Sequence, residues 1–93
     1  MAHRARILDE AQRTTCGARA SDYGEPAENM AHIATMWNAY LGDQLASPIR
    51  ADQVAWMMVN VKQCRAANSS MKLDHYVDAA AYSGIAGECA DAE

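Results

Sequence analysis

Several residue types and patterns that mark common protein classes are missing from this chain. It has no Phe, and none of its apolar stretches approaches the roughly 20 residues that a membrane-spanning helix needs. The two arginines near the N-terminus are followed by the polar segment ILDEAQ, which does not resemble the apolar core of a secretion signal. These absences argue against a membrane or secreted protein and predict a cytoplasmic location.

Basic residues and paired cysteines are also scarce. The chain has eight Lys and Arg against twelve Asp and Glu, so its net charge of −4 argues against direct binding of nucleic acid. Its three cysteines, Cys16, Cys64 and Cys89, are an odd number, lie far apart and form no C-x-x-C motif. This pattern predicts free thiols in a reducing compartment rather than a disulfide framework.

The length of the chain is sufficient for one small domain. Its 93 residues are expected to form a single helical domain, residues 1–93, in which residues 1–2 and 90–93 are frayed. A domain of this size buries only about two-thirds of the surface of its unfolded chain. A second copy that covers an apolar face would add stability. We therefore expect a homodimer, with Met and Trp side chains of the second and third helices at its interface.

The spacing of apolar residues predicts an all-α fold. Helices are expected at His3–Thr15, at Pro26–Leu41, from Arg50 or Ala51 to Ala67, and at Met71–Cys89. Together they would form a compact helical bundle of three long helices plus a short N-terminal helix. The segment VAWMMVNVK is nearly apolar all round, which predicts that the third helix is the central and most buried one.

The fourth helix carries small residues at intervals of four. These rows predict that another helix backbone approaches closely, and they consist of Ala79, Ser83 and Gly87, and of Ala80 and Gly84.

Two pairs of acidic residues are the best candidates for a functional site. Asp74 and Asp78 are four residues apart, so they share one face of the last helix and repel each other unless a cation or basic partner lies nearby. Glu25 and Glu28 open the second helix, and antiparallel pairing would bring all four carboxylates to one divalent metal or phosphate. The alternative is structural: solvated acids on one helix, and favourable acids at the start of another.

Other residues fit either a ligand site or a structural role. Lys62 follows an apolar run, so its ammonium group needs an acid: it either pairs with Asp74 or Asp78, or contacts phosphate with Arg65 nearby. Tyr23 precedes Gly24 and would stack on a base or close over the helix core. Asn29 would bind a base or ribose, or satisfy backbone groups.

Longer motifs resemble a family of small phage and prophage proteins of unknown function. The segments DYGEPAEN, MWNAYLG, MMVNVKQCR and DHYVDAAAY carry this resemblance, which covers roughly residues 7–86. The first of them matches a D-Y-G-[DE]-P-x-x-N motif of that family, and the motifs are long enough to be fairly specific. The resemblance implies a phage-derived protein that acts in the cytoplasm of the host cell.

The order of charged residues is distantly similar to the MazG-like all-α nucleoside triphosphate pyrophosphohydrolases. In those enzymes four carboxylates of two helices surround Mg²⁺, which holds the triphosphate and helps to activate water. The similarity implies Glu25, Glu28, Asp74 and Asp78 as metal ligands, with Glu28, Asp74 and Asp78 catalytic. It implies Lys62 as a phosphate contact, and Tyr23, Asn29 and Arg65, singled out above by residue type and position, would complete a nucleotide-binding site. This chain departs from the pattern, because it lacks an E-E-x-x-E run and its second acidic pair is spaced four apart rather than three.

Three functions follow as hypotheses. The first is an Mg²⁺-dependent pyrophosphohydrolase-like protein that binds nucleotide phosphate. The second is a non-enzymatic phage anti-defence protein, such as an inhibitor of the anti-CRISPR type, which binds a host protein complex by mimicking the charge of nucleic acid. The third is a nucleotide sponge that retains Tyr23, Lys62 and Arg65 without a metal.

Overall fold

The computed structural model describes residues 3–16 and 24–92 of the chain, and these residues form four α-helices and one short 3₁₀ helix. In chain order the elements are α1 (His3–Cys16), α3 (Pro26–Leu41), η1 (Gly42–Gln44), α4 (Ala51–Ala67) and α5 (Leu73–Ala92). No strand occurs within these described ranges. The predicted all-α class is therefore confirmed, and the helix positions agree with the prediction to within three residues.

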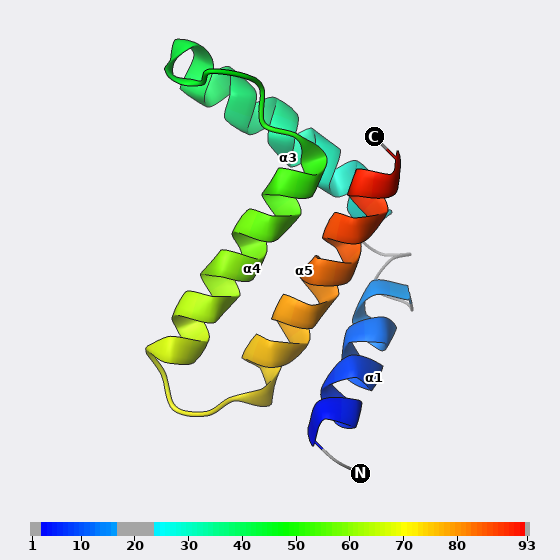
Figure 1. Ribbon diagram of the computed structural model, residues 1–93. Coiled ribbons are helices and arrows are strands. Elements are labelled where there is room, and N and C mark those ends of the chain that lie inside the picture. Colours follow the sequence, from blue (N-terminus) through cyan, green and yellow to red (C-terminus); the bar gives the residue numbers. More distant parts are fainter. Residues whose placement is uncertain (1–2, 17–23, 93) are drawn as a thin grey trace.

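Three of the helices lie side by side and the fourth crosses one end of them. Figure 1 shows α5 between α4 and α1, with α3 lying across the end where α4 begins and α5 finishes. The far end of α3 and the 3₁₀ helix η1 project beyond the three-helix layer. The molecule accordingly measures 48 × 31 × 22 Å along its principal axes. The four helices do pack together, but the arrangement is a layer with a crossing helix rather than a parallel-sided bundle.

The central helix is α5, and the prediction that the third helix, α4, is the most buried was wrong. Five residues of α5 are buried: Val77, Ala81, Ile85, Ala86 and Cys89. Only two are buried on α4. The apolar run of α4 leaves Trp56 50% exposed, because α3 and α5 cover only the side of α4 that carries Val54 and Ala55.

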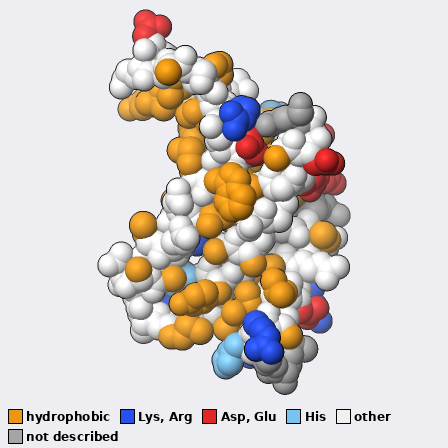
Figure 2. Space-filling model, viewed as in Figure 1, with side chains coloured by type: hydrophobic (Ala, Val, Ile, Leu, Met, Phe, Trp, Pro, Cys, Tyr) orange, Lys and Arg blue, Asp and Glu red, His pale blue; other side chains and the backbone are white. Residues whose placement is uncertain are grey.

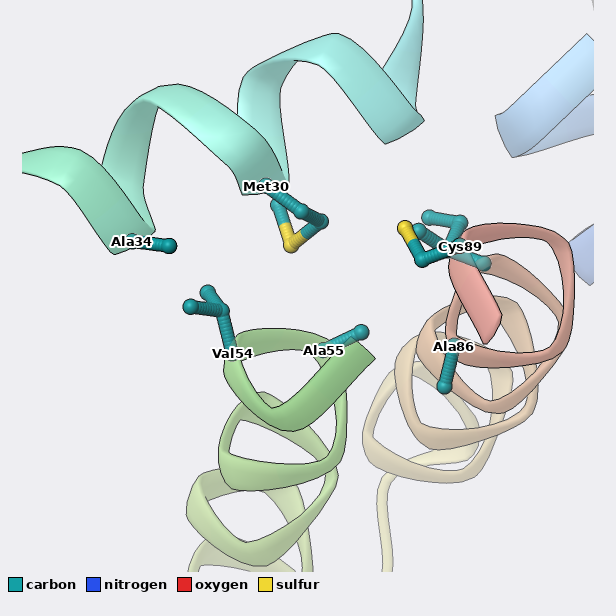
Figure 3. Packing of buried hydrophobic residues seen from close by; sticks show 7 residues of the cluster. Met30, Ala34, Val54, Ala55, Ala86 and Cys89 are labelled. Carbon is teal, nitrogen blue, oxygen red and sulfur yellow. The ribbon is translucent and has the colours of Figure 1, made fainter. Parts of the chain in front are cut away.

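The main core lies where α3, α4 and α5 meet. In Figure 3, Met30 of α3 points into the space between Ala55 of α4 and Cys89 of α5. Ala55 and Ala86 have no exposed surface, so small side chains allow α4 and α5 to approach closely. A second, smaller cluster joins α1 to α5 and consists of Ala11, Val77 and Ala81.

The two glycines in the predicted rows of small residues on α5 are not points of close approach. A Cβ atom added to Gly84 or Gly87 would meet nothing within 4 Å, so neither glycine makes room for a neighbouring backbone. Ala81 and Ala86 are buried, and Ala80, a member of one predicted row, packs against the smaller cluster that joins α1 to α5.

Local sequence explains the position of α3. Pro26 occupies the first helical turn, where the missing N–H would have no partner, and Gly42 ends the helix with a φ of 51°. The side chain of Asn38 then fixes the following loop: its Nδ2 donates to the carbonyl of Ile49 at 3.0 Å, and its Oδ1 accepts from the Ile49 amide at 2.7 Å. This pair of bonds holds the start of α4 against α3.

The last helix starts and ends later than predicted. It begins at Leu73 rather than Met71 and continues to Ala92 rather than Cys89. Among the described residues, none of the helices combines the length and apolar character needed to cross a membrane.

Candidate functional site

The described residues line a solvent-open cavity of about 230 Å³ to which all four helices contribute. Its apolar lining includes Met30 and Ile85, which are both buried. Its polar lining includes Lys62 of α4 and Asp78 of α5, together with Asn29 of α3. Three of the residues predicted for a nucleotide site therefore line one cavity.

The charged pair at this cavity is the ion pair that the sequence predicts as one alternative. Lys62 Nζ lies 3.3 Å from Asp78 Oδ2, while the Lys62 side chain is only 13% exposed and that of Asp78 is 37% exposed. The stem of Lys62 is thus packed between helices, and its ammonium group reaches the cavity. An ammonium group so shielded from water needs an anionic partner, which here is Asp78.

Uncharged groups complete the polar lining. Thr14 Oγ1 and Thr15 Oγ1 lie at the end of α1 and donate to backbone carbonyls of their own helix, to Glu10 at 2.8 Å and to Ala11 at 3.2 Å. Their oxygens can still accept hydrogen bonds. Tyr82 lines the same cavity from α5 and supplies a ring and a hydroxyl group.

Thr14, Thr15 and Tyr82 were not among the site residues predicted from the sequence. Tyr82 could have been found from spacing, because it lies four residues after Asp78 and so shares its helix face. The two threonines carry no such signal, because only the packing of α1 against α5 brings them to the cavity.

The backbone at one edge of the cavity needs glycine. Gly24 has a φ of 82°, a conformation that residues with a Cβ atom rarely adopt. It lines the cavity directly before α3. Tyr23, the predicted stacking residue, lies outside the described residues.

Four other predicted site residues are not brought to this cavity. Arg65 and Asp74 are exposed and are not part of its lining. Glu28 is exposed, and Glu25 lines a different cavity, beside Glu88 and between α1 and α5. The expected meeting of the two acidic pairs is therefore not found.

The length of α5 explains this separation. The first turns of α3 pack through Met30 against Ile85 and Cys89, near the end of α5. Asp74 lies in the first turn of α5, eleven residues before Ile85. At about 1.5 Å per residue this corresponds to roughly 16 Å along the helix axis. Helix α3 crosses α5 near its end rather than lying along it, so Glu25 and Glu28 do not reach the level of Asp74.

The positions of the acidic side chains also determine whether they could bind a metal ion together. Among residues 3–16 and 24–92, no three His, Cys, Asp or Glu side chains are grouped so that they could hold a metal ion. The described carboxylates thus do not fit the multi-carboxylate Mg²⁺ site that the resemblance implies. Magnesium binding by this protein stays a prediction, and no chemical step is assigned to a metal.

The cavity contains the Lys62 ammonium group, which is already paired with Asp78. Neutral hydrogen-bonding groups and apolar side chains line the rest of it. An anionic group of a ligand would share or displace the Lys62–Asp78 contact. The amide of Asn29 and the hydroxyl group of Tyr82 would then be available for a sugar or base.

Comparisons with known proteins place these features in a phage context. Residues 6–90 match the model of a family described as Domain of unknown function (DUF6378). The Gene 55 protein of Mycobacterium phage L5 is 38% identical over 79 residues, which are 85% of this chain and 49% of the relative. The Gene 55 protein of Mycobacterium phage D29 is 35% identical over 78 residues, or 84% of this chain and 49% of the relative. This chain therefore spans about half the length of these curated relatives. No solved structure matches the chain significantly.

Proposed function

The chain belongs to the family described as Domain of unknown function (DUF6378) and is similar to phage proteins, and we propose that it binds nucleotide phosphate in the cavity at Lys62. One observation carries the proposal: a largely buried lysine, 13% exposed, presents its ammonium group at a cavity whose other polar lining includes an amide and hydroxyl groups. The cavity, of about 230 Å³, is somewhat smaller than the roughly 300–1,000 Å³ typical of small-molecule sites.

Four lining residues have a role in this proposal. Lys62 contacts a phosphate oxygen, because an ammonium group of low exposure interacts strongly with an anion. Asn29 and Tyr82 bind the sugar or base by hydrogen bonding and ring contact. Asp78 holds Lys62 in position when no ligand is present. The Asp78 carboxylate also competes with phosphate for the positively charged Lys62 ammonium group. This version is the nucleotide sponge, which requires no metal.

The pyrophosphohydrolase activity of the MazG-like enzymes is the more specific form of the proposal. Water would add to the α-phosphorus of a nucleoside triphosphate, and pyrophosphate would leave with nucleoside monophosphate as the second product. The described carboxylates offer no multi-acid group that would support this chemistry. Release of pyrophosphate in the presence of Mg²⁺ therefore separates an enzyme from a binding protein.

Replacing Lys62 tests the proposed site directly. Lys62→Met keeps most of the packed stem and removes the charge, so we expect nucleotide affinity to fall about ten-fold or more, in line with the 1.5–3 kcal/mol that hydrogen bonds to charged groups contribute. Isothermal titration calorimetry with a panel of nucleoside mono-, di- and triphosphates, with Mg²⁺ or EDTA, gives the measurement.

A matched lysine provides the control for this experiment. Lys72 lies in the exposed turn between α4 and α5, and Lys72→Met makes the same change of charge away from the cavity. We expect this variant to bind as the wild type does. Equal losses in both variants would show that only net charge matters. No binding to any nucleotide at roughly millimolar concentration would overturn the proposal.

A second candidate function rests on the phage relatives and on the exposed acids. Glu25, Glu28 and Asp74 are exposed and spread apart, which suits an acidic surface better than a metal site. Such a surface could occupy a basic channel of a host defence complex. A pull-down from host lysate that recovers one defence complex, and is lost at high salt, would favour this anti-defence function.

The expected homodimer also remains a proposal. Its support is the number of large apolar side chains that α3 and α4 leave exposed, among them Met36, Tyr40, Trp56 and Met57. Soluble monomers rarely expose apolar patches of more than a few hundred Å² without a partner.

A further inference from the structure

The projecting part of the molecule leaves two apolar surfaces without a described neighbour. One is a cleft beneath the loop that joins η1 to α4, with a volume of about 370 Å³. Its lining carries no charged residue and consists of Leu45, Ser47, Pro48, Ile49, Gln53, Trp56 and Met57. The absence of charge in this lining favours an apolar occupant, because a charged group would lose its hydration there.

The other surface is a stripe on α3, formed by Met36 and Tyr40. These two residues are one turn apart and are 69% and 87% exposed. Met36 and Tyr40 are each two residues from Asn38 in the sequence, which corresponds to a rotation of about 200° around the helix axis. The stripe thus faces away from the loop that the Asn38 side chain holds. The stripe therefore does not fill the cleft of its own chain. Figure 2 shows hydrophobic side chains exposed on the projecting part and continuing onto the adjoining body.

We propose that the stripe of one copy inserts into the cleft of a second copy, and that the reciprocal contact completes a two-fold symmetric homodimer. This inference rests on the homodimer proposed above and specifies its interface. The two surfaces suit one another, since an uncharged cleft and a Met–Tyr stripe are both apolar with a polar edge. A two-fold axis uses each surface twice, so both are covered on both copies.

The exposed area is of the right order for such a contact. Tyr40, Met36, Trp56 and Met57 together expose on the order of 500 Å² per copy, judged from the 150–250 Å² that an aromatic side chain can bury. A stable interface covers about 800 Å² per partner, and the polar neighbours of the cleft would supply the remainder.

The interface is tested with two single variants and their mixture. Tyr40→Glu places a charge in the stripe, and Met57→Lys places the opposite charge in the cleft. Each variant alone has two mismatched contacts in its homodimer, so each should sediment as a monomer of 10.1 kDa where the wild type has twice that mass. In an equimolar mixture one contact pairs Glu with Lys and the other is unchanged, so the dimer should return.

A matched control keeps this experiment selective. Met71 is 65% exposed in the turn before α5, away from both surfaces, so Met71→Glu should leave the mass of the dimer unchanged. Circular dichroism confirms that each variant is folded.

The possible failures can be told apart. A wild type that stays monomeric overturns both the homodimer and this interface. A dimer that survives Tyr40→Glu, or variants whose mixture stays monomeric, overturns the interface and leaves the homodimer. Recovery of the dimer in the mixture is expected only if the stripe occupies the cleft.

Discussion

Asp78 is the residue on which the metal-free and metal-dependent hypotheses make opposite predictions. If Lys62 binds phosphate directly, Asp78 competes for its charge, and Asp78→Asn removes that competitor. The Asp78 side chain is 37% exposed, so water screens its half of the ion pair. At up to about 1 kcal/mol for such a partly screened contact, nucleotide should bind roughly two- to five-fold more tightly to the variant. If Asp78 instead ligates Mg²⁺, the same variant should lose Mg²⁺-dependent binding.

Asp74→Asn is the comparison that makes the measurement of the Asp78 variant decisive. Asp74 lies one turn earlier on α5, is exposed and does not line the cavity. Without a metal its replacement should leave the affinity nearly unchanged, whereas a shared metal site requires both aspartates. Titration of both variants with and without EDTA separates these outcomes, and weaker metal-free binding by Asp78→Asn would contradict direct phosphate binding by Lys62.

For individual residues, the sequence predicted part of the site at the Lys62 cavity. The need of a lysine in an apolar run for an acidic partner correctly indicated Lys62 beside Asp78. Helical spacing also placed Asp74 and Asp78 on one helix, but it could not show where a second helix crosses. That crossing point determines that Asn29 lines the cavity and that Glu28 does not.

Helix α5 shows how the sequence can predict an element correctly and misjudge its neighbours. Proline, glycine and apolar spacing identified all four helices, because these signals are local. Burial depends on the packing of whole helices. The apolar segment of α4 therefore appeared central, while α5, with many small residues, occupies the centre. Exposed apolar residues on α4 are better explained by an interface than by a core.

Gly87 in α5 leads to a stability prediction at the scale of the element. It is exposed within the helix, has an ordinary negative φ, and a Cβ atom there would meet nothing within 4 Å. Gly87→Ala should therefore raise the free energy of unfolding by about 0.5–1 kcal/mol through the lower entropy of the unfolded chain.

Gly24→Ala provides the contrast. That residue has an equally open surrounding but a φ of 82°, so the substitution should destabilise the fold by about 1–2 kcal/mol. Urea denaturation of both variants gives the two values. A loss of stability in Gly87→Ala would show that the glycine rows of α5 do contact another backbone, as the sequence first suggested.

For the whole molecule, the projecting end of α3 connects the two proposals. The same helix supplies Asn29 to the cavity at its start and the Met36–Tyr40 stripe near its end. A second copy bound to the stripe would brace α3 and so the wall of the cavity. Nucleotide binding and self-association are then expected to support each other, since each favours the same position of α3.

Thermal unfolding at different protein concentrations tests whether the folded unit is a dimer. A dimer that unfolds to separate chains gains stability with concentration, by about 1.4 kcal/mol per mole of dimer for each tenfold increase. With an unfolding entropy of about 2.1 cal/mol/K per residue of both chains, this corresponds to a rise in Tm of about 4 °C per tenfold. Tyr40→Glu should remove the dependence and lower Tm to a constant value. If the Tm of the wild type is independent of concentration, the 93-residue chain folds as a monomer, and its exposed tryptophan and methionines need a different partner.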